Sequence, residues 1–241
     1  MKTVKKKTKK LERIPTGIPN LDALIQNGFI RNSTNLVSGD AGSGKTIFAI
    51  QFLIHGITKC NEPGIYITFE EKKEEFYQTM LSLGWDLEKL EKQGKFIFLE
   101  YTPEQVKNVL VEGGGTIETA ISKIKAKRIV IDSISSFALL YTDKLKKQQA
   151  ALNLFDLISK WDCTALLTAQ GKPGKKNNGI STSLEFEVDS IIILYHKKIK
   201  GIRKRAIEIL KMRGTKIPEK TFELEINNKG ISINTRKTIS F

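Results

Sequence analysis

The sequence of 241 residues is poor in cysteine and histidine, with two of each. Cys60 and Cys163 lie far apart, and neither forms a CxxC pattern or stands in a histidine cluster. This usage argues against a disulfide framework and against a zinc site. It favours a reducing compartment, so we expect a cytoplasmic protein.

The sequence also lacks long apolar runs. No stretch approaches the ~20 apolar residues that a membrane-spanning helix needs. The lysine-rich residues 1–10 are not followed by the apolar segment of a secretory signal. We therefore expect neither a membrane span nor a membrane partner. Hydrophobic residues still make up 40% of the chain, which is enough for a sizeable core. We expect residues 1–10 to form a disordered basic tail and residues 11–241 to form one domain.

What the sequence has in excess is positive charge. The net charge is +14 and the isoelectric point is near 9.6. Such a surface attracts nucleic acid, acidic proteins or anionic membranes. The alternative is a surface adapted to solubility in a salty or hot cell, where lysine-rich surfaces are common. Charge alone does not separate these alternatives.

The chain is organised around Gly39-Asp40-Ala41-Gly42-Ser43-Gly44-Lys45-Thr46 (the P-loop), which fits G-x-x-x-x-G-K-[ST] at every fixed position. A predicted strand precedes it and a predicted helix follows it, so its backbone N–H groups and the helix N-terminus can cradle phosphates. Lys45 is predicted to reach the β- and γ-phosphates of ATP, and the Thr46 hydroxyl to bind Mg²⁺. The alternative is a glycine-rich turn without a ligand. The residues predicted to surround the phosphates are Gly39, Asp40, Ala41, Gly42, Ser43, Gly44, Lys45, Thr46 and Ile47.

Strand and helix patterns alternate over the first two thirds of the chain. Strands are predicted at residues 34–38, 64–69, 96–99, 128–132 and 164–169, and helices at 47–56, 73–83, 85–94, 117–126 and 146–160. Four further strands joined by short turns follow at residues 190–196, 205–212, 221–226 and 230–233. This order predicts an α/β fold with a mostly parallel sheet flanked by helices and extended by antiparallel C-terminal strands.

Three details of this pattern are specific enough to test. Glycines 113–115 predict a loop. The three-residue spacing of Leu152, Phe155 and Ile158 predicts that they share the buried face of their helix. A short helix is expected at about residues 20–25, ahead of Gly28.

Polar residues follow three of the predicted strands, at the edge where an open parallel sheet binds its ligands. Asp132 ends one strand and is predicted to bind Mg²⁺ with Thr46. The alternative is that Asp132 caps the next segment. Glu70 and Glu71 end another strand, and at least one is predicted to polarise the attacking water. The alternative is an acidic first turn of the following helix, and both roles can hold together.

Two further groups are weaker candidates on the residues alone. Gln170 ends a third strand, where its amide could sense the γ-phosphate, or it could simply start a loop. Lys211 and Arg213 are two residues apart, so they point the same way in extended chain and suit a phosphate. The alternative for this pair is a basic strand edge.

Taken together, the motifs resemble one family. Their order is Thr16-Gly17-Ile18-Pro19-Asn20-Leu21-Asp22, the P-loop, Tyr66-Ile67-Thr68-Phe69-Glu70-Glu71, Gly84-Trp85-Asp86-Leu87, Ile129-Val130-Ile131-Asp132-Ser133 and Lys211-Met212-Arg213-Gly214-Thr215. This combination is similar to the single-domain KaiC-like ATPases of the RecA/RadA superfamily, a type carried by many archaea. The resemblance covers about residues 12–233.

The resemblance implies more than the spacing does. It implies a RecA-type core, a homo-oligomeric ring that is usually a hexamer, and ATP with Mg²⁺ bound between neighbours. Glu70 and Glu71 would be the paired catalytic glutamates, and Ser82 would touch the nucleotide. The residues that would reach into the neighbouring subunit's site are Lys211, Met212, Arg213 and Thr215.

The sequence also departs from parts of the family. It has one P-loop, unlike the tandem clock protein, and no C-terminal segment matches the phosphorylated tail of that protein. Gln170 is closer to the recombinase branch. Residues 171–179 stand where recombinases place a DNA-facing loop, and the predicted DNA contacts there are Lys172, Lys175 and Lys176. This loop contains no aromatic residue, so any binding would be blind to sequence.

Three functions follow as hypotheses. The first is a Mg²⁺-dependent, ATP-hydrolysing ring protein with an active site shared between subunits. The second is a DNA-binding accessory protein of recombination or repair that uses ATP as an assembly switch. It is motivated by the tail and by residues 197–216, which contain nine basic residues and a single acidic residue, Glu208. The third is a signalling or scaffold ATPase, although nothing in the sequence identifies a protein partner.

Overall fold

The structure is a computed structural model that describes residues 11–102, 105, 115–139, 141, 143–171 and 186–241. The predicted basic tail and the proposed DNA contacts Lys172, Lys175 and Lys176 lie outside the described residues.

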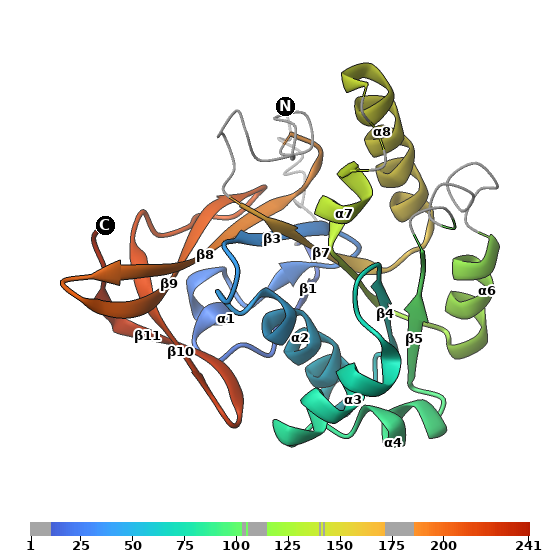
Figure 1. Ribbon diagram of the computed structural model, residues 1–241, viewed down its shortest axis with the longest axis horizontal. Coiled ribbons are helices and arrows are strands. Elements are labelled where there is room, and N and C mark those ends of the chain that lie inside the picture. Colours follow the sequence, from blue (N-terminus) through green and yellow to red (C-terminus); the bar gives the residue numbers. More distant parts are fainter. Residues whose placement is uncertain (1–10, 103–104, 106–114, 140, 142, 172–185) are drawn as a thin grey trace, which may run out of the picture.

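One nine-stranded sheet forms the centre of the protein (Figure 1), in the order β11-β10-β9-β8-β3-β7-β6-β4-β5. Its strands are β3 (Thr34–Gly39), β4 (Gly64–Thr68), β5 (Phe96–Glu100), β6 (Arg128–Asp132), β7 (Thr164–Gln170), β8 (Ser190–Ile199), β9 (Ile202–Met212), β10 (Thr221–Asn227) and β11 (Gly230–Thr238). The strands from β5 to β8 in this order run parallel, and β9, β10 and β11 continue the sheet antiparallel. A separate two-stranded sheet joins β1 (Arg13–Ile14) to β2 (Phe29–Ile30). The predicted fold class is confirmed.

Helices cover both faces of the sheet. They are α1 (Leu21–Leu24), α2 (Lys45–Lys59), α3 (Lys73–Ser82), α4 (Leu87–Lys92), α6 (Gly115–Ile124), α7 (Ile134–Leu139) and α8 (Lys144–Lys160). Neighbouring strand residues point to opposite faces, so Val37 belongs to the core cluster that includes residues of α2, α3 and α4, while Leu36 belongs to the cluster that includes residues of α6, α7 and α8. These two groups of helices lie on opposite sides of the sheet (Figure 1). A sheet buried on both faces explains why its strands are continuous apolar runs.

Three details differ from the sequence-based expectation. Gly115 begins α6 instead of lying in a loop. The serine-rich segment after Asp132, for which no element was predicted, forms α7, where the buried Ile134 packs into the core. The buried face of α8 is centred on Leu154 and Ile158, and Leu152 is only half-buried. A strict three-residue spacing drifts away from the 3.6-residue turn of a helix.

A buried ion pair ties the connection after α2 to the start of β6, and no sequence motif marks it. Arg128 is fully buried, and its Nε and Nη2 atoms both lie 2.7 Å from Glu62 Oε2. Its Nη1 donates to the Phe52 carbonyl at 2.8 Å, and its guanidinium lies 4.5 Å from the centre of the Phe52 ring. Gly56 makes room for this arrangement, since a Cβ there would lie 2.3 Å from Arg128 Nε.

Replacing Glu62 by alanine should destabilise the fold strongly. The substitution leaves the Arg128 guanidinium buried without its counter-ion, and such a change costs about 3–5 kcal/mol. Urea unfolding followed by circular dichroism measures the loss. The control is Glu100→Ala, which removes the partner of the exposed Lys72 and should move the unfolding midpoint far less. Equal losses in the two variants would contradict a dominant role for the buried pair.

Candidate active site

The P-loop joins the carboxyl end of β3 to α2, and close packing explains two of its glycines. A Cβ on Gly39 would lie 2.3 Å from the Leu194 carbonyl oxygen of the adjacent strand β8. Gly44 has a φ of +103°, and a Cβ there would lie 2.7 Å from Ile226 Cδ1. A side chain at either position would force the loop apart, so glycine is required for reasons of space as well as conformation.

Lys45 is the first residue of α2, and its side chain folds back over the P-loop. Its Nζ donates to the carbonyls of Gly39 at 2.9 Å and of Asp40 at 3.1 Å. Burial lowers the pKa of the Lys45 ammonium, while the nearby carboxylates of Asp132, Asp40 and Glu70 act in the opposite direction. The ammonium therefore lies inside the loop, where phosphate oxygens could replace these carbonyls as its hydrogen-bond acceptors.

Asp132 connects the P-loop to the neighbouring strands. One of its oxygens accepts hydrogen bonds from Thr46 Oγ1 at 2.8 Å and from the Tyr66 hydroxyl at 2.7 Å, and the other accepts from Thr168. Burial first and Asp132 second raise the pKa of Tyr66, so its hydroxyl stays protonated and donates. Among the described hydrogen bonds, the Asp132 side chain accepts none from a backbone N–H, in contrast to the capping alternative. A hydroxyl and a carboxylate are oxygen ligands that suit Mg²⁺.

Glu70 and Glu71 follow β4 after one intervening residue, Phe69, and lie beside Asp132. Thr68 pairs with Asp132 in the sheet, and its hydroxyl accepts from the backbone N–H groups of Glu70 at 3.2 Å and Glu71 at 3.1 Å. The Glu70 carboxylate accepts from the hydroxyls of Ser133 at 3.4 Å and of Ser136. The pKa of Glu71 is raised by burial and then by the charges of Asp132, Glu70 and Glu75. A carboxylate with a raised pKa is a stronger base, as water activation requires.

This environment predicts an acid limb in the pH profile of ATP turnover. The ordinary pKa of a glutamate side chain is 4.5, and that of Glu71 is higher. Lowering the pH protonates the base, so kcat/KM should fall through a midpoint above pH 4.5. Glu70→Gln removes a neighbouring negative charge, so the midpoint of its residual activity should move down towards 4.5. A midpoint that does not respond to Glu70→Gln would contradict the coupling of the two carboxylates.

Two predicted nucleotide contacts occupy very different places. Gln170 ends β7 and pairs with Gly39 in the sheet, so it lies beside the P-loop with an exposed side chain. Its backbone N–H donates to Ser135 Oγ at 2.7 Å. Ser82 lies at the far end of α3, exposed, and its hydroxyl donates to the Thr79 carbonyl at 2.7 Å. No described hydrogen bond joins Ser82 to the P-loop of its own chain.

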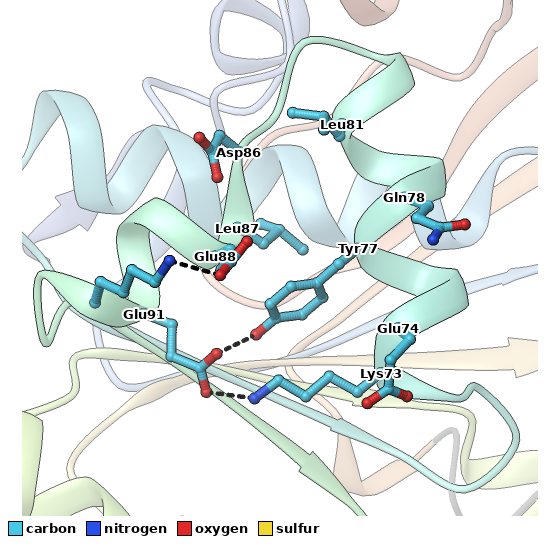
Figure 2. A pocket seen from close by; sticks show the side chains of 10 residues that line it. Lys73, Glu74, Tyr77, Gln78, Leu81, Asp86, Leu87, Glu88 and Glu91 are labelled. Atoms are coloured by element: carbon cyan, nitrogen blue, oxygen red, sulfur yellow. Dashed lines mark hydrogen bonds and ion pairs between the residues drawn. The ribbon is translucent and has the colours of Figure 1, made fainter.

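A cavity of about 600 Å³ lies between α3 and α4 and contains none of the predicted site residues. Figure 2 shows the Lys73 and Tyr77 side chains converging on Glu91, at 2.9 Å and 3.0 Å. Burial and Glu91 raise the pKa of the Tyr77 hydroxyl, which therefore remains a donor. These three polar side chains hydrogen-bond to one another across the two helices, so they are not free to bind a ligand in the cavity.

The residues expected to act on a neighbour lie at the opposite edge of the sheet from the P-loop. Met212 pairs with Ser190, which pairs with Asn35 near the start of β3, whereas the P-loop follows the end of that strand. From Asn35 to Gly39 the strand advances four residues, which separates the two edges by about 13 Å. Neither Lys211 nor Arg213 can therefore complete the site of its own chain.

Contacts within the chain fix these side chains. Arg213 Nη1 lies 3.3 Å from Asp189 Oδ1, and its Nη2 donates to the Phe186 carbonyl. Lys211 Nζ donates to the Val188 carbonyl at 2.7 Å. Thr215 Oγ1 accepts from Arg13 at 2.7 Å. Asp189, which sequence reasoning missed, also accepts from the Thr34 N–H at 2.9 Å and so anchors Arg213 to β3.

Comparison with known proteins decides the family. A family model described as "ATPase: KaiC" matches residues 14–238. The chain belongs to the KaiC family of ATPases. The crystal structure of a KaiC-like protein from Pyrococcus horikoshii OT3 superimposes on this KaiC-family chain with a TM-score of 0.83 and 35% identity, over 93% of this chain and 99% of that one. The predicted resemblance and the RecA-type core are thereby confirmed.

Two kinds of relative stand out among KaiC-family sequences. The UPF0273 protein of Methanocaldococcus jannaschii is 34% identical over 95% of this chain and 99% of its own length. The circadian clock oscillator protein KaiC of Thermostichus vulcanus is also 34% identical, over 92% of this chain but only 44% of its own length. The chain thus spans less than half of the clock protein. None of the described helices has the length and hydropathy needed to cross a bilayer.

Proposed function

We propose that the chain binds and hydrolyses ATP with Mg²⁺, and that a neighbouring subunit completes the active site. The observation that carries the proposal is the 2.8 Å hydrogen bond from Thr46 to Asp132. It joins the P-loop to the end of β6, and Glu70 follows the end of the neighbouring strand β4, so phosphate cradle, metal ligands and base candidates meet at one edge of the sheet. Membership of an ATPase family supports the same reaction.

The residues divide the chemistry among them. Glu71, with Glu70 beside it, would take a proton from water, whose oxygen then forms a bond to the γ-phosphorus as the bond to the β-phosphate oxygen breaks. Lys45 would stabilise the negative charge that develops on the phosphate oxygens. Thr46 and Asp132 would hold Mg²⁺, which neutralises charge on the β- and γ-phosphates when it is bound.

The placement of Arg213 supports a site shared between subunits. An arginine beside the γ-phosphate supplies planar, charge-assisted hydrogen bonds to the transition state. Arg213 lies at the amino edge of β3, so it can do this only in another copy of the chain. We propose the same for Lys211, with Met212 and Thr215 on the same segment, and a ring, such as a hexamer, as the assembly. Residues 11–241 would act in it as one domain.

Light scattering coupled to size exclusion, with and without Mg²⁺ and ATP, tests the shared site. We expect a mass several times that of the 27.1-kDa chain in the presence of nucleotide, because ATP bound between subunits stabilises their contact. The matched control is the Arg213→Ala variant, whose assembly should be weaker at the same ATP concentration. A protein that remains a monomer in both states would overturn the shared site while leaving nucleotide binding intact.

A further inference from the structure

The tip of the β8–β9 hairpin carries the most concentrated positive charge of the described structure. Residues 196–205 contain no acidic side chain, and their six lysines and arginines are Lys197, Lys198, Lys200, Arg203, Lys204 and Arg205. The two strands run together as a ribbon towards the edge of the molecule, away from α6 and α8 (Figure 1). We call this segment, residues 196–205, the basic ribbon.

The register of the basic ribbon places like charges opposite each other. Lys197 faces Lys204, and Lys198 faces Arg203, directly across the strand pair. Like charges in this position destabilise a hairpin. Among the described residues, no carboxylate lies within 4.0 Å of any of the six cations. The charge therefore opposes folding of the hairpin. Lys197 lies over the Phe241 ring and Arg205 donates to the Gly42 carbonyl, but the exposed side chains of Lys198, Lys200, Arg203 and Lys204 are left available to an external anion.

The geometry selects among polyanions. Opposite residues in a strand pair share a face, so Lys198 and Arg203 lie on one face and Lys197 and Lys204 on the other. A flat membrane or a single acidic peptide would meet only one face. The groove of a nucleic-acid duplex has phosphates along both walls, and the major groove, about 12 Å wide, admits a two-stranded ribbon.

The apolar tip fits the same partner. Ile199 pairs with Ile202 at the end of the ribbon, and Ile202 is 65% exposed. An aliphatic tip can lie against base edges at the floor of a groove while cations contact the walls. We propose that the basic ribbon binds in the groove of double-stranded nucleic acid, chiefly through phosphate contacts. The proposal goes beyond ATP hydrolysis and does not depend on it.

The test variant removes three ribbon cations that are exposed and touch nothing in the P-loop: Lys198→Gln, Arg203→Gln and Lys204→Gln in one chain. Arg205 is left unchanged because its Nε donates to the Gly42 carbonyl at 3.1 Å. The matched control removes three exposed lysines from α6 and α8, by Lys123→Gln, Lys146→Gln and Lys160→Gln. Both variants therefore lose the same charge and keep the N-terminal tail.

Fluorescence anisotropy with a labelled DNA duplex, over a series of salt concentrations, gives the comparison. We expect the ribbon variant to bind at least about tenfold more weakly at low salt, with a log–log salt dependence less steep by about 3. The control variant should bind nearly as the wild type does. Thermal unfolding of the ribbon variant should occur no earlier than that of the wild type, because the opposed charges are removed.

Three results would overturn the proposal. The first is a ribbon variant that binds duplex as tightly, and with the same salt slope, as the wild type. The second is an equal loss in the control variant, which would assign binding to net charge. The third is competition by polyglutamate as effective as that by duplex at equal charge concentration, which would point to an acidic protein. ATP turnover, measured on the same samples, reports separately on the proposed hydrolysis.

Discussion

Lys45→Ala should reduce ATP turnover by at least about a thousandfold, measured as phosphate release at saturating Mg²⁺ and ATP. The Lys45 ammonium is partly buried and already bonded to oxygens of the P-loop, so its charge acts through a poorly hydrated environment. A charge in such a place stabilises a developing phosphate charge far better than one in water. Alanine keeps the helix but leaves no cation at the start of α2.

The control for this variant lies on the same helix. Lys59→Ala removes an exposed lysine from the other end of α2 and should leave turnover near the wild-type value. Matching unfolding curves for the two variants would show that the loss is chemical and not structural. Turnover by Lys45→Ala within a few-fold of the wild type would end the assignment of residues 39–46 as an ATP site.

Mixing two inactive variants should restore activity. Arg213→Ala keeps an intact P-loop and glutamates, and Glu70→Ala/Glu71→Ala keeps an intact Arg213. When equal amounts are co-expressed and then held at protein and ATP concentrations that saturate assembly of both variants, about one quarter of the interfaces in randomly assembled rings combine the two intact halves. We therefore expect phosphate release at about a quarter of the wild-type rate, while each variant alone is nearly inactive.

The matched control combines two defects in the same half of the site. Lys45→Ala co-expressed with Glu70→Ala/Glu71→Ala offers no interface with an intact P-loop half, so it should show no recovery. If the Arg213→Ala mixture behaves in the same way as this control, Arg213 does not act across an interface. Partial recovery in the first mixture alone identifies the site as shared.

The central fold and much of the candidate site could be predicted from the sequence, because short-range patterns determine them. The P-loop has fixed spacing, and Asp132 ends an apolar run whose neighbours are parallel strands. Carboxyl ends of parallel strands share one edge, so Thr46 and Asp132 are expected to meet although 86 residues separate them.

The remaining contacts depend on the order and register of strands that are distant in the sequence, and no local sequence pattern predicts these. Tyr66 and Thr168 donate to Asp132 only because β4 and β7 flank β6. In the sequence, Arg128 resembles an ordinary cation at the start of a strand. Only the folded structure brings Glu62 and Phe52 into contact with it. The placement of Arg213 at the far edge from the P-loop needed the order of β3, β8 and β9. Contacts of this kind are properties of the assembled sheet.

The opposite placement of the P-loop and Arg213 along β3 restricts the symmetry of any assembly that uses both. Each chain would offer one half-site at one edge and the complementary half at the other, so contacts must be head-to-tail. A two-fold dimer with identical contacting patches cannot form such a site. Successive copies must instead be related by a rotation, which gives a closed ring, or by a rotation with a translation, which gives a helical filament. The choice between ring and filament then depends on the angle between neighbours and not on the chemistry of the site.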